Sequence, residues 1–205
     1  MIRDIGFIGL GVMGFHIASH LLKKKFNIHI IKRKSSKTRK FLRIFKKQNN
    51  LFVSNNLGEL SNKSDVIITC VGNDKDLQEV YLSKNGIINN ITKKKFLVDH
   101  TTCSVNISKQ IYKRCLEKES YFYDAPMSGG EIGAINGSLS LMVGGNKNQF
   151  KHVKSILDIY SKSLIYMGDS GSGQISKMVN QICVASVIQG LAEAINFAKK
   201  KKIKI

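Results

Sequence analysis

The stretch GFIGLGVMG, residues 6–14, constrains the fold more than any other part of this sequence. It spaces three glycines as GxGxxG between an apolar, strand-like segment and a segment of helical periodicity. Such glycines permit a tight turn, a close approach of the backbone to a pyrophosphate, and close packing of the helix on a sheet. The following helix offers free N–H groups to a phosphate. The sequence therefore predicts a dinucleotide site here, with Gly9, Leu10, Gly11, Val12, Met13 and Gly14 as cofactor-binding residues.

Apolar runs alternate with amphipathic segments along the rest of the chain. Strands are expected near residues 2–8, 27–31, 65–71, 95–99, 121–124, 139–143 and 163–167. Helices are expected near residues 12–24, 36–47, 74–82, 103–118 and 147–160. This alternation, with short connectors, predicts an α/β fold with a Rossmann-type, doubly wound and mostly parallel sheet.

The pattern changes at about residue 172, where a long apolar helical segment begins. It is too long and too apolar to cover one face of a sheet, so we expect it to pack within a helical domain. We divide the chain into an NADP-binding Rossmann-like domain, 1–168, and the start of a C-terminal helical domain, 169–205. The lysine-rich end, residues 199–205, leads us to expect that this second domain is truncated.

Composition excludes several classes of protein. The four cysteines show no metal-finger spacing, so we expect reduced thiols, a cytoplasmic location and no metal site. The first expected strand begins near residue 2, so no leader is expected. No uninterrupted apolar run of 18 residues is present, so no membrane span is expected.

The formal net charge of +19 raises the alternative of nucleic-acid binding. The lysines are spread along the whole chain, and no aromatic-interleaved or finger-like module accompanies them. This distribution favours compositional drift, so no specific nucleic-acid partner is expected. A continuous positive stripe on the surface would support the alternative.

The end of the second expected strand indicates which cofactor binds. A site selective for NAD carries an Asp or Glu there, but this chain has no acidic residue between Asp4 and Glu59. Arg33, with Lys32, Lys34 and Ser35 beside it, is instead suited to bind a 2′-phosphate. The sequence therefore favours NADP(H), with NAD(H) as the alternative.

Several segments together resemble the β-hydroxyacid dehydrogenase family, which includes 3-hydroxyisobutyrate dehydrogenase, tartronate semialdehyde reductase and glyoxylate/succinic semialdehyde reductases. A larger relative is 6-phosphogluconate dehydrogenase. Besides GFIGLGVMG, the matching segments are SDVIITCVGNDKDLQEV (64–80), VDHTTCS (98–104), DAPMSGGEIGAINGSLSLMVGG (124–145) and GSGQISKMVNQ (171–181). They occur in the family's order and cover essentially the whole chain.

The resemblance implies roles for residues outside the first loop. Val71 and Gly72 would pass beneath the cofactor, and Thr102 would place its hydroxyl near the nicotinamide ribose. Lys177 matches the family's catalytic lysine. The resemblance also implies a cradle for the substrate carboxylate, formed by Ser128, Gly129 and Gly130.

A lysine is chemically suited to this role, because reducing a carbonyl group needs a proton for the developing alkoxide. A partly apolar pocket lowers a lysine pKa toward neutrality, and the apolar neighbours of Lys177 suggest such a pocket. Asn180 and Gln181 lie three and four residues further on, on the same helical face. Either amide could orient the lysine or hold the substrate.

The function expected from these residues is an NAD(P)-dependent oxidoreductase that interconverts a small β-hydroxyacid and its semialdehyde or keto acid. Its partner would be a small carboxylate-bearing substrate, and a complete helical domain would make it a homo-oligomer. The alternative is a truncated, catalytically impaired remnant that binds only the cofactor. A frameshift at an A-rich tract would produce such an end, and the gene would then encode the missing helices in a second frame.

Overall fold

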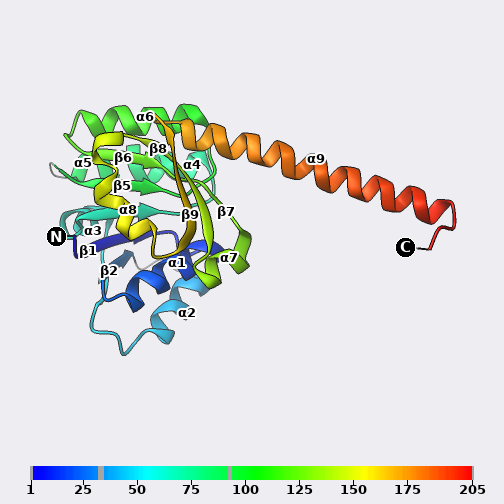
Figure 1. Ribbon diagram of the computed structural model, residues 1–205. Coiled ribbons are helices and arrows are strands. Elements are labelled where there is room, and N and C mark those ends of the chain that lie inside the picture. Colours follow the sequence, from blue (N-terminus) through cyan, green and yellow to red (C-terminus); the bar gives the residue numbers. More distant parts are fainter. Residues whose placement is uncertain (1, 32–34, 92–93, 205) are drawn as a thin grey trace.

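One twisted sheet with helices on both faces forms the body of the protein, as a computed structural model that describes residues 2–31, 35–91 and 94–204 shows (Figure 1). The strand order is β3-β2-β1-β4-β5-β6-β8-β7, and β9 pairs with β8. The strands are β1 (Asp4–Ile8), β2 (Asn27–Ile31), β3 (Leu51–Ser54), β4 (Val66–Thr69), β5 (Phe96–Asp99), β6 (Tyr121–Asp124), β7 (Met127–Ser128), β8 (Leu139–Gly145) and β9 (Ser161–Gly168).

The first six strands are parallel, whereas β8 runs antiparallel to β6 and to β7, and β9 is parallel to β8. This confirms the predicted doubly wound, mostly parallel sheet. The helical segments are α1 (Val12–Lys23), α2 (Ser36–Ile44), α3 (Leu57–Lys63), α4 (Asp74–Leu77), η1 (Gln78–Leu82), α5 (Ile87–Asn90), α6 (Val105–Leu116), α7 (Gly130–Asn136), η2 (Lys147–Gln149), α8 (Lys151–Leu157) and α9 (Ser172–Lys200).

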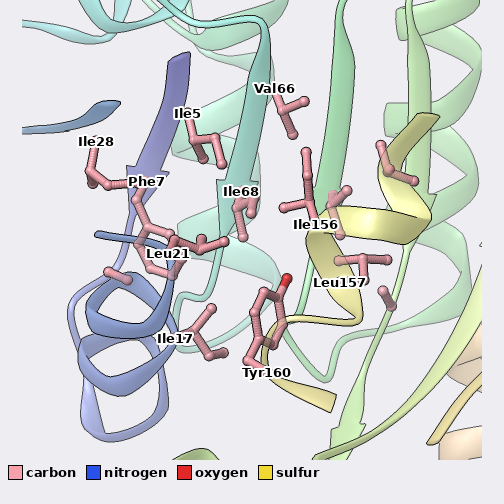
Figure 2. Close-up of a cluster of buried hydrophobic side chains, with 14 of the residues drawn as sticks. Ile5, Phe7, Ile17, Leu21, Ile28, Val66, Ile68, Ile156, Leu157 and Tyr160 are labelled. Carbon is pink, nitrogen blue, oxygen red and sulfur yellow. The ribbon is translucent and has the colours of Figure 1, made fainter. Parts of the chain in front are cut away.

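Two hydrophobic cores lie on opposite faces of this sheet. Because side chains alternate along a strand, Val66 and Ile68 of β4 enter one core and Ile67 enters the other. Figure 2 shows the first core, where Ile17 and Leu21 of α1 meet strand side chains and residues of α8. The second core lies beneath α3, α5 and α6. The loops at the carboxyl ends of the strands therefore follow strands that are packed on both faces.

Five short elements were not expected from the sequence: β3, α3, α5, β7 and α7. The edge strand β3 exposes Phe52 and Val53, so it lacks the alternation of a half-buried strand. The helix α7 begins at Gly129 and Gly130, which both have positive φ angles, and glycines normally indicate a turn instead of a helix start. The expected strands and the longer helices are confirmed, with ends that differ by a few residues.

Helix α9 extends away from the body of the protein (Figure 1). Only Gly173, Gln174 and Lys177 are buried, and Gly190 does not interrupt the helix. One window of 18 residues has a mean hydropathy of 1.4 and no burial, so by length and composition alone α9 could cross a membrane. The search for an uninterrupted apolar run did not reveal this. A core helix of a helical domain has the same composition, and the domain division at residue 168 stays a prediction.

Candidate active site

The GxGxxG loop is closely packed against its neighbours. Gly9 has a φ angle of +101°, and a Cβ atom there would overlap the carbonyl oxygen of Cys70. A Cβ atom on Gly14 would overlap the carbonyl oxygen of Gly9 and lie 3.0 Å from Phe7 Cε1. Both positions therefore require glycine for the fold itself, which holds the loop between β1 and α1.

Gly11 differs, because a Cβ atom there would meet no atom within 4 Å. It is the N-cap of α1, where no side chain accepts a hydrogen bond from the first turn, and no acidic residue lies in that turn. Gly14 N is hydrogen-bonded to the Cys70 thiol. The N–H groups of Val12 and Met13, at the very start of α1, are free to bind an anion. The open space at Gly11 and these free donors fit a dinucleotide pyrophosphate.

A cleft of about 490 Å³ opens above this loop. The expected residues 9–13 line it, and so do Val71 and Gly72 from the loop after β4. Lys32, Arg33 and Lys34 lie outside the described residues. The cleft instead shows residues 35–38, of which the sequence reasoning had named only Ser35.

Ser35 begins α2 by accepting a hydrogen bond from Thr38 N at 3.0 Å. The sequence signal that could have identified Ser35 as the N-cap of this helix was a serine three residues before a threonine. Together with Lys37, these side chains bring hydroxyl groups and one ammonium group to the end of the cleft next to β2.

A buried carboxyl group joins the loops after β4 and β5. Asp99 Oδ1 accepts hydrogen bonds from Thr69 Oγ1 and Thr101 Oγ1, each at 2.7 Å. Thr101 Oγ1 in turn accepts one from Val71 N at 3.1 Å. Burial raises the pKa of Asp99 to about 7, and its Oδ2 has no hydrogen-bond partner in the described part of the chain. The exposed Thr102 therefore comes directly after a residue, Thr101, whose side chain is held by hydrogen bonds to Asp99 and Val71.

The start of α9 is tied to β6 and to the loop after β5. Asp124 accepts hydrogen bonds from Gly171 N at 2.7 Å and from Gln174 N at 3.0 Å. The side chain of Gln174 donates to Thr101 O at 2.7 Å and accepts from Cys103 N at 3.2 Å. Burial raises the pKa of Asp124. Neither Asp124 nor Gln174 was selected from the sequence, because no local sequence pattern shows which distant loop a side chain will contact.

Lys177 lies one helical turn after Gln174. It is only 7% exposed, and burial lowers its pKa. No hydrogen bond or ion pair of its Nζ is found within residues 2–31, 35–91 and 94–204. Its neighbour Asn180 is half-buried and donates to Gln181 Oε1 at 3.1 Å, but Gln181 is exposed. The structure thus buries Lys177 without bringing Gln181 into a pocket.

The expected apolar surroundings of Lys177 are a point of correction. Ile175, Met178 and Val179 are exposed by 49%, 42% and 57%, because they lie on the faces of α9 that point away from the sheet. Helical neighbours in sequence therefore do not bury the lysine. The body of the protein does so, since the same face carries Gly173 and Gln174.

The expected carboxylate cradle lies at the end of β7 and the start of α7. Ser128 is half-buried, whereas Gly129 and Gly130 are exposed, with φ angles of +123° and +60°. His20 of α1 contacts the carbonyl oxygens near the end of α7, Ala134 O at 2.9 Å among them. This contact links α1 to α7, the helix that begins at the expected cradle. In the described ranges no hydrogen bond joins the cradle to Lys177, and no cluster of His, Cys, Asp and Glu could hold a metal.

Comparison with known proteins identifies the family. Residues 4–168 match the family described as the NAD binding domain of 6-phosphogluconate dehydrogenase. The chain belongs to the family of 6-phosphogluconate and 3-hydroxyisobutyrate dehydrogenases. This confirms the resemblance seen in the sequence motifs.

Two relatives and one solved structure are similar over nearly the whole chain. An oxidoreductase of Bacillus subtilis is 41% identical over 98% of the chain and 68% of its own length. The mitochondrial 3-hydroxyisobutyrate dehydrogenase of Mus musculus is 32% identical over 94% of the chain and 56% of its own length. The structure of the Mycobacterium tuberculosis 3-hydroxyisobutyrate dehydrogenase with L-serine shares the fold, with a TM-score of 0.89 at 23% identity, over 100% of this chain and 67% of that one. The chain thus spans between about half and two thirds of these proteins.

Proposed function

We propose that this protein is an NADP(H)-dependent oxidoreductase that interconverts a small β-hydroxyacid and its semialdehyde or keto acid. The observation that carries the proposal is the tether between the helix of Lys177 and the loop of Thr102, 2.7 Å long from Gln174 Nε2 to Thr101 O. This tether holds the helix of the buried Lys177 against the loop after β5, where Thr101 accepts a hydrogen bond from Val71 in the wall of the cleft. Family membership supports the same class of reaction.

The cofactor fits the residues that are present. The free N–H groups at the start of α1 would hold its pyrophosphate, and the open space at Gly11 leaves room for it. The bound nicotinamide supplies or accepts the hydride. Thr102 would contact the nicotinamide ribose, above the support that Asp99 gives to the preceding residue.

The preference for NADP(H) rests on the end of the cleft next to β2. Lys37 and two serines line this end, and the sequence has no acidic residue between Asp4 and Glu59 that could accept the ribose hydroxyls. A lysine and serine hydroxyls suit a 2′-phosphate. We propose that Arg33 completes this subsite together with Lys32 and Lys34.

Lys177 would hold the proton that the substrate oxygen needs. Burial lowers its pKa, so its ammonium group releases a proton more readily than an exposed lysine does. In reduction Nζ donates this proton to the developing alkoxide, and in oxidation neutral Nζ accepts it from the hydroxyl. Ser128 and the backbone N–H groups of Gly129 and Gly130 would bind the substrate carboxylate, with Asn180 as a further polar contact.

A second candidate is a protein that binds the cofactor but does not catalyse. It is favoured by the exposure of α9 beyond its first turns, which leaves Gln181 in solvent. Under this alternative NADPH would bind, but no substrate would be reduced.

Steady-state reduction of a panel of small aldehyde acids tests the proposal, with the consumption of NADPH as the signal. The panel contains glyoxylate and the succinic, tartronate and methylmalonate semialdehydes. We expect turnover of at least one, and Lys177→Met should reduce kcat at least 100-fold while NADPH still binds. Lys199→Met, at an exposed site on the same helix, is the matched control. NADPH binding without turnover of any substrate would favour the second candidate, and equal kcat in both variants would refute the role of Lys177.

A further inference from the structure

Gln174 is a fully buried polar side chain in the first turn of the otherwise exposed α9. Burying an amide is costly unless both of its ends are hydrogen-bonded. Both ends of Gln174 are satisfied, by Thr101 O and Cys103 N, and its backbone N–H is held by Asp124. Each of these partners lies more than 45 residues away in the chain, so this one residue joins the start of α9 to two distant segments, the loop after β5 and the end of β6.

The loop that Gln174 holds is also hydrogen-bonded to β5 and to the loop after β4. Thr101 Oγ1 donates to Asp99 and accepts from Val71 N, which lines the cofactor cleft. A continuous series of hydrogen bonds therefore runs from α9 through Gln174 and Thr101 to Val71. Lys177 lies three residues after Gln174 and shares its helical face.

We propose that Gln174 is a positioning residue that sets the place of Lys177 relative to the nicotinamide end of the cofactor cleft. The amide clamps the first turn of α9 onto residues 101–103, so that Lys177 stays buried at the edge of the sheet. This role rests on the proposed function for its catalytic meaning, but the clamp itself is a property of the folded chain. A Gln174 that only stabilised the fold would affect unfolding and leave the environment of Lys177 unchanged.

Two substitutions separate these roles. Gln174→Met keeps the length of the side chain and removes both of its hydrogen bonds. Gln174→Glu keeps an acceptor for Cys103 N but sets an oxygen against Thr101 O in place of the donor. Gln189→Met is the matched control, because Gln189 is exposed on the same helix and bonds only Glu193 in the described part of the chain.

The readout is the pH dependence of acetylation of Lys177 by acetic anhydride, followed by mass spectrometry of its peptide. Only the neutral amine reacts, so the midpoint of the rate profile reports the pKa of Lys177. Burial, with no charged neighbour contributing in the described ranges, lowers this pKa in the wild type. We expect the midpoint to rise by about one pH unit in Gln174→Met, a tenfold change in the acid equilibrium, and by at least as much in Gln174→Glu. Circular dichroism checks that each variant is folded.

An unchanged midpoint in folded Gln174→Met would overturn the proposal, and so would an equal rise in Gln189→Met. If Gln174→Met does not fold, Gln174→Glu decides by the same criterion. Fluorescence titration of the wild type with NADPH keeps the two hypotheses apart. If the midpoint shifts in Gln174→Met but the wild type does not bind NADPH, the proposed function is refuted and the clamp is retained.

Discussion

The substitution Asp99→Asn tests whether the carboxyl group beneath the two cofactor loops is as strongly perturbed as its surroundings imply. The group is fully buried, and burial raises its pKa from 3.8 to about 7. An acid with a raised pKa in the folded state favours folding in its protonated form. Asp99 therefore lowers the free energy of unfolding least at low pH, and this free energy falls as the pH rises from about 4 to about 7.

The size of the effect follows from the two pKa values. The raised pKa lowers the free energy of unfolding by about 2 kcal/mol at pH 5, where folding must add a proton to the carboxylate, and by about 4 kcal/mol at pH 8. An asparagine carries no such cost and retains an oxygen for Thr69 and Thr101. The difference in unfolding free energy between Asp99→Asn and the wild type should thus move in favour of the variant by about 2–3 kcal/mol between pH 5 and pH 8. Any pH-independent cost of the amide cancels in this comparison.

Urea unfolding of both proteins at the two pH values measures this difference. Asp158→Asn, at the exposed end of α8, is the matched control, and its difference from the wild type should change by less than about 0.5 kcal/mol. A constant difference between Asp99→Asn and the wild type would refute the argument, since Asp99 would then ionise as easily in the folded as in the unfolded chain.

The remaining predictions concern the first loop and the core beneath it. Gly9→Ala should destabilise the fold by roughly 1–3 kcal/mol, because of its positive φ angle and the overlap with Cys70, as urea unfolding will show. Gly11→Val should lower the free energy of unfolding by no more than about 1 kcal/mol, the cost of a poorer N-cap, but weaken NADPH binding at least tenfold; equal affinity would mean that the pyrophosphate binds elsewhere. Leu21→Ala, in the fully buried core of α1, should cost about 2–5 kcal/mol, and a cost below 1 kcal/mol would contradict the packing described for this core.

The sheet and its main helices could be predicted from the sequence because their signals are local. Apolar runs mark the buried strands, and GFIGLGVMG marks the turn into α1. The edge strand β3 gave no such signal, since Phe52 and Val53 are exposed on it. Helix α7 starts in a conformation that only glycines adopt readily, so its composition resembles a loop.

Part of the lining of the cleft could be read from the sequence, whereas the roles of these residues stay predictions. The cleft contains residues 9–13 of the expected loop together with Val71 and Gly72, but not Gly14. Gln174 was missed because its partners, at residues 101 and 103, are close only in the folded chain. Gln181 shares a helical face with Lys177 by spacing, but α9 has already left the sheet at that point, so the side chain is exposed. Spacing along a helix predicts a shared face and not what covers it.

Fluorescence titration of the chain with NADPH and with NADH, beside Gly11→Val, tests the central claim most directly. The account predicts saturable binding of NADPH, at least tenfold weaker binding of NADH, and at least tenfold weaker binding of NADPH by the variant. This result would locate the cofactor at the start of α1 and support the 2′-phosphate subsite beside residues 35–38. Absence of binding by either cofactor, or binding that Gly11→Val leaves unchanged, would contradict it.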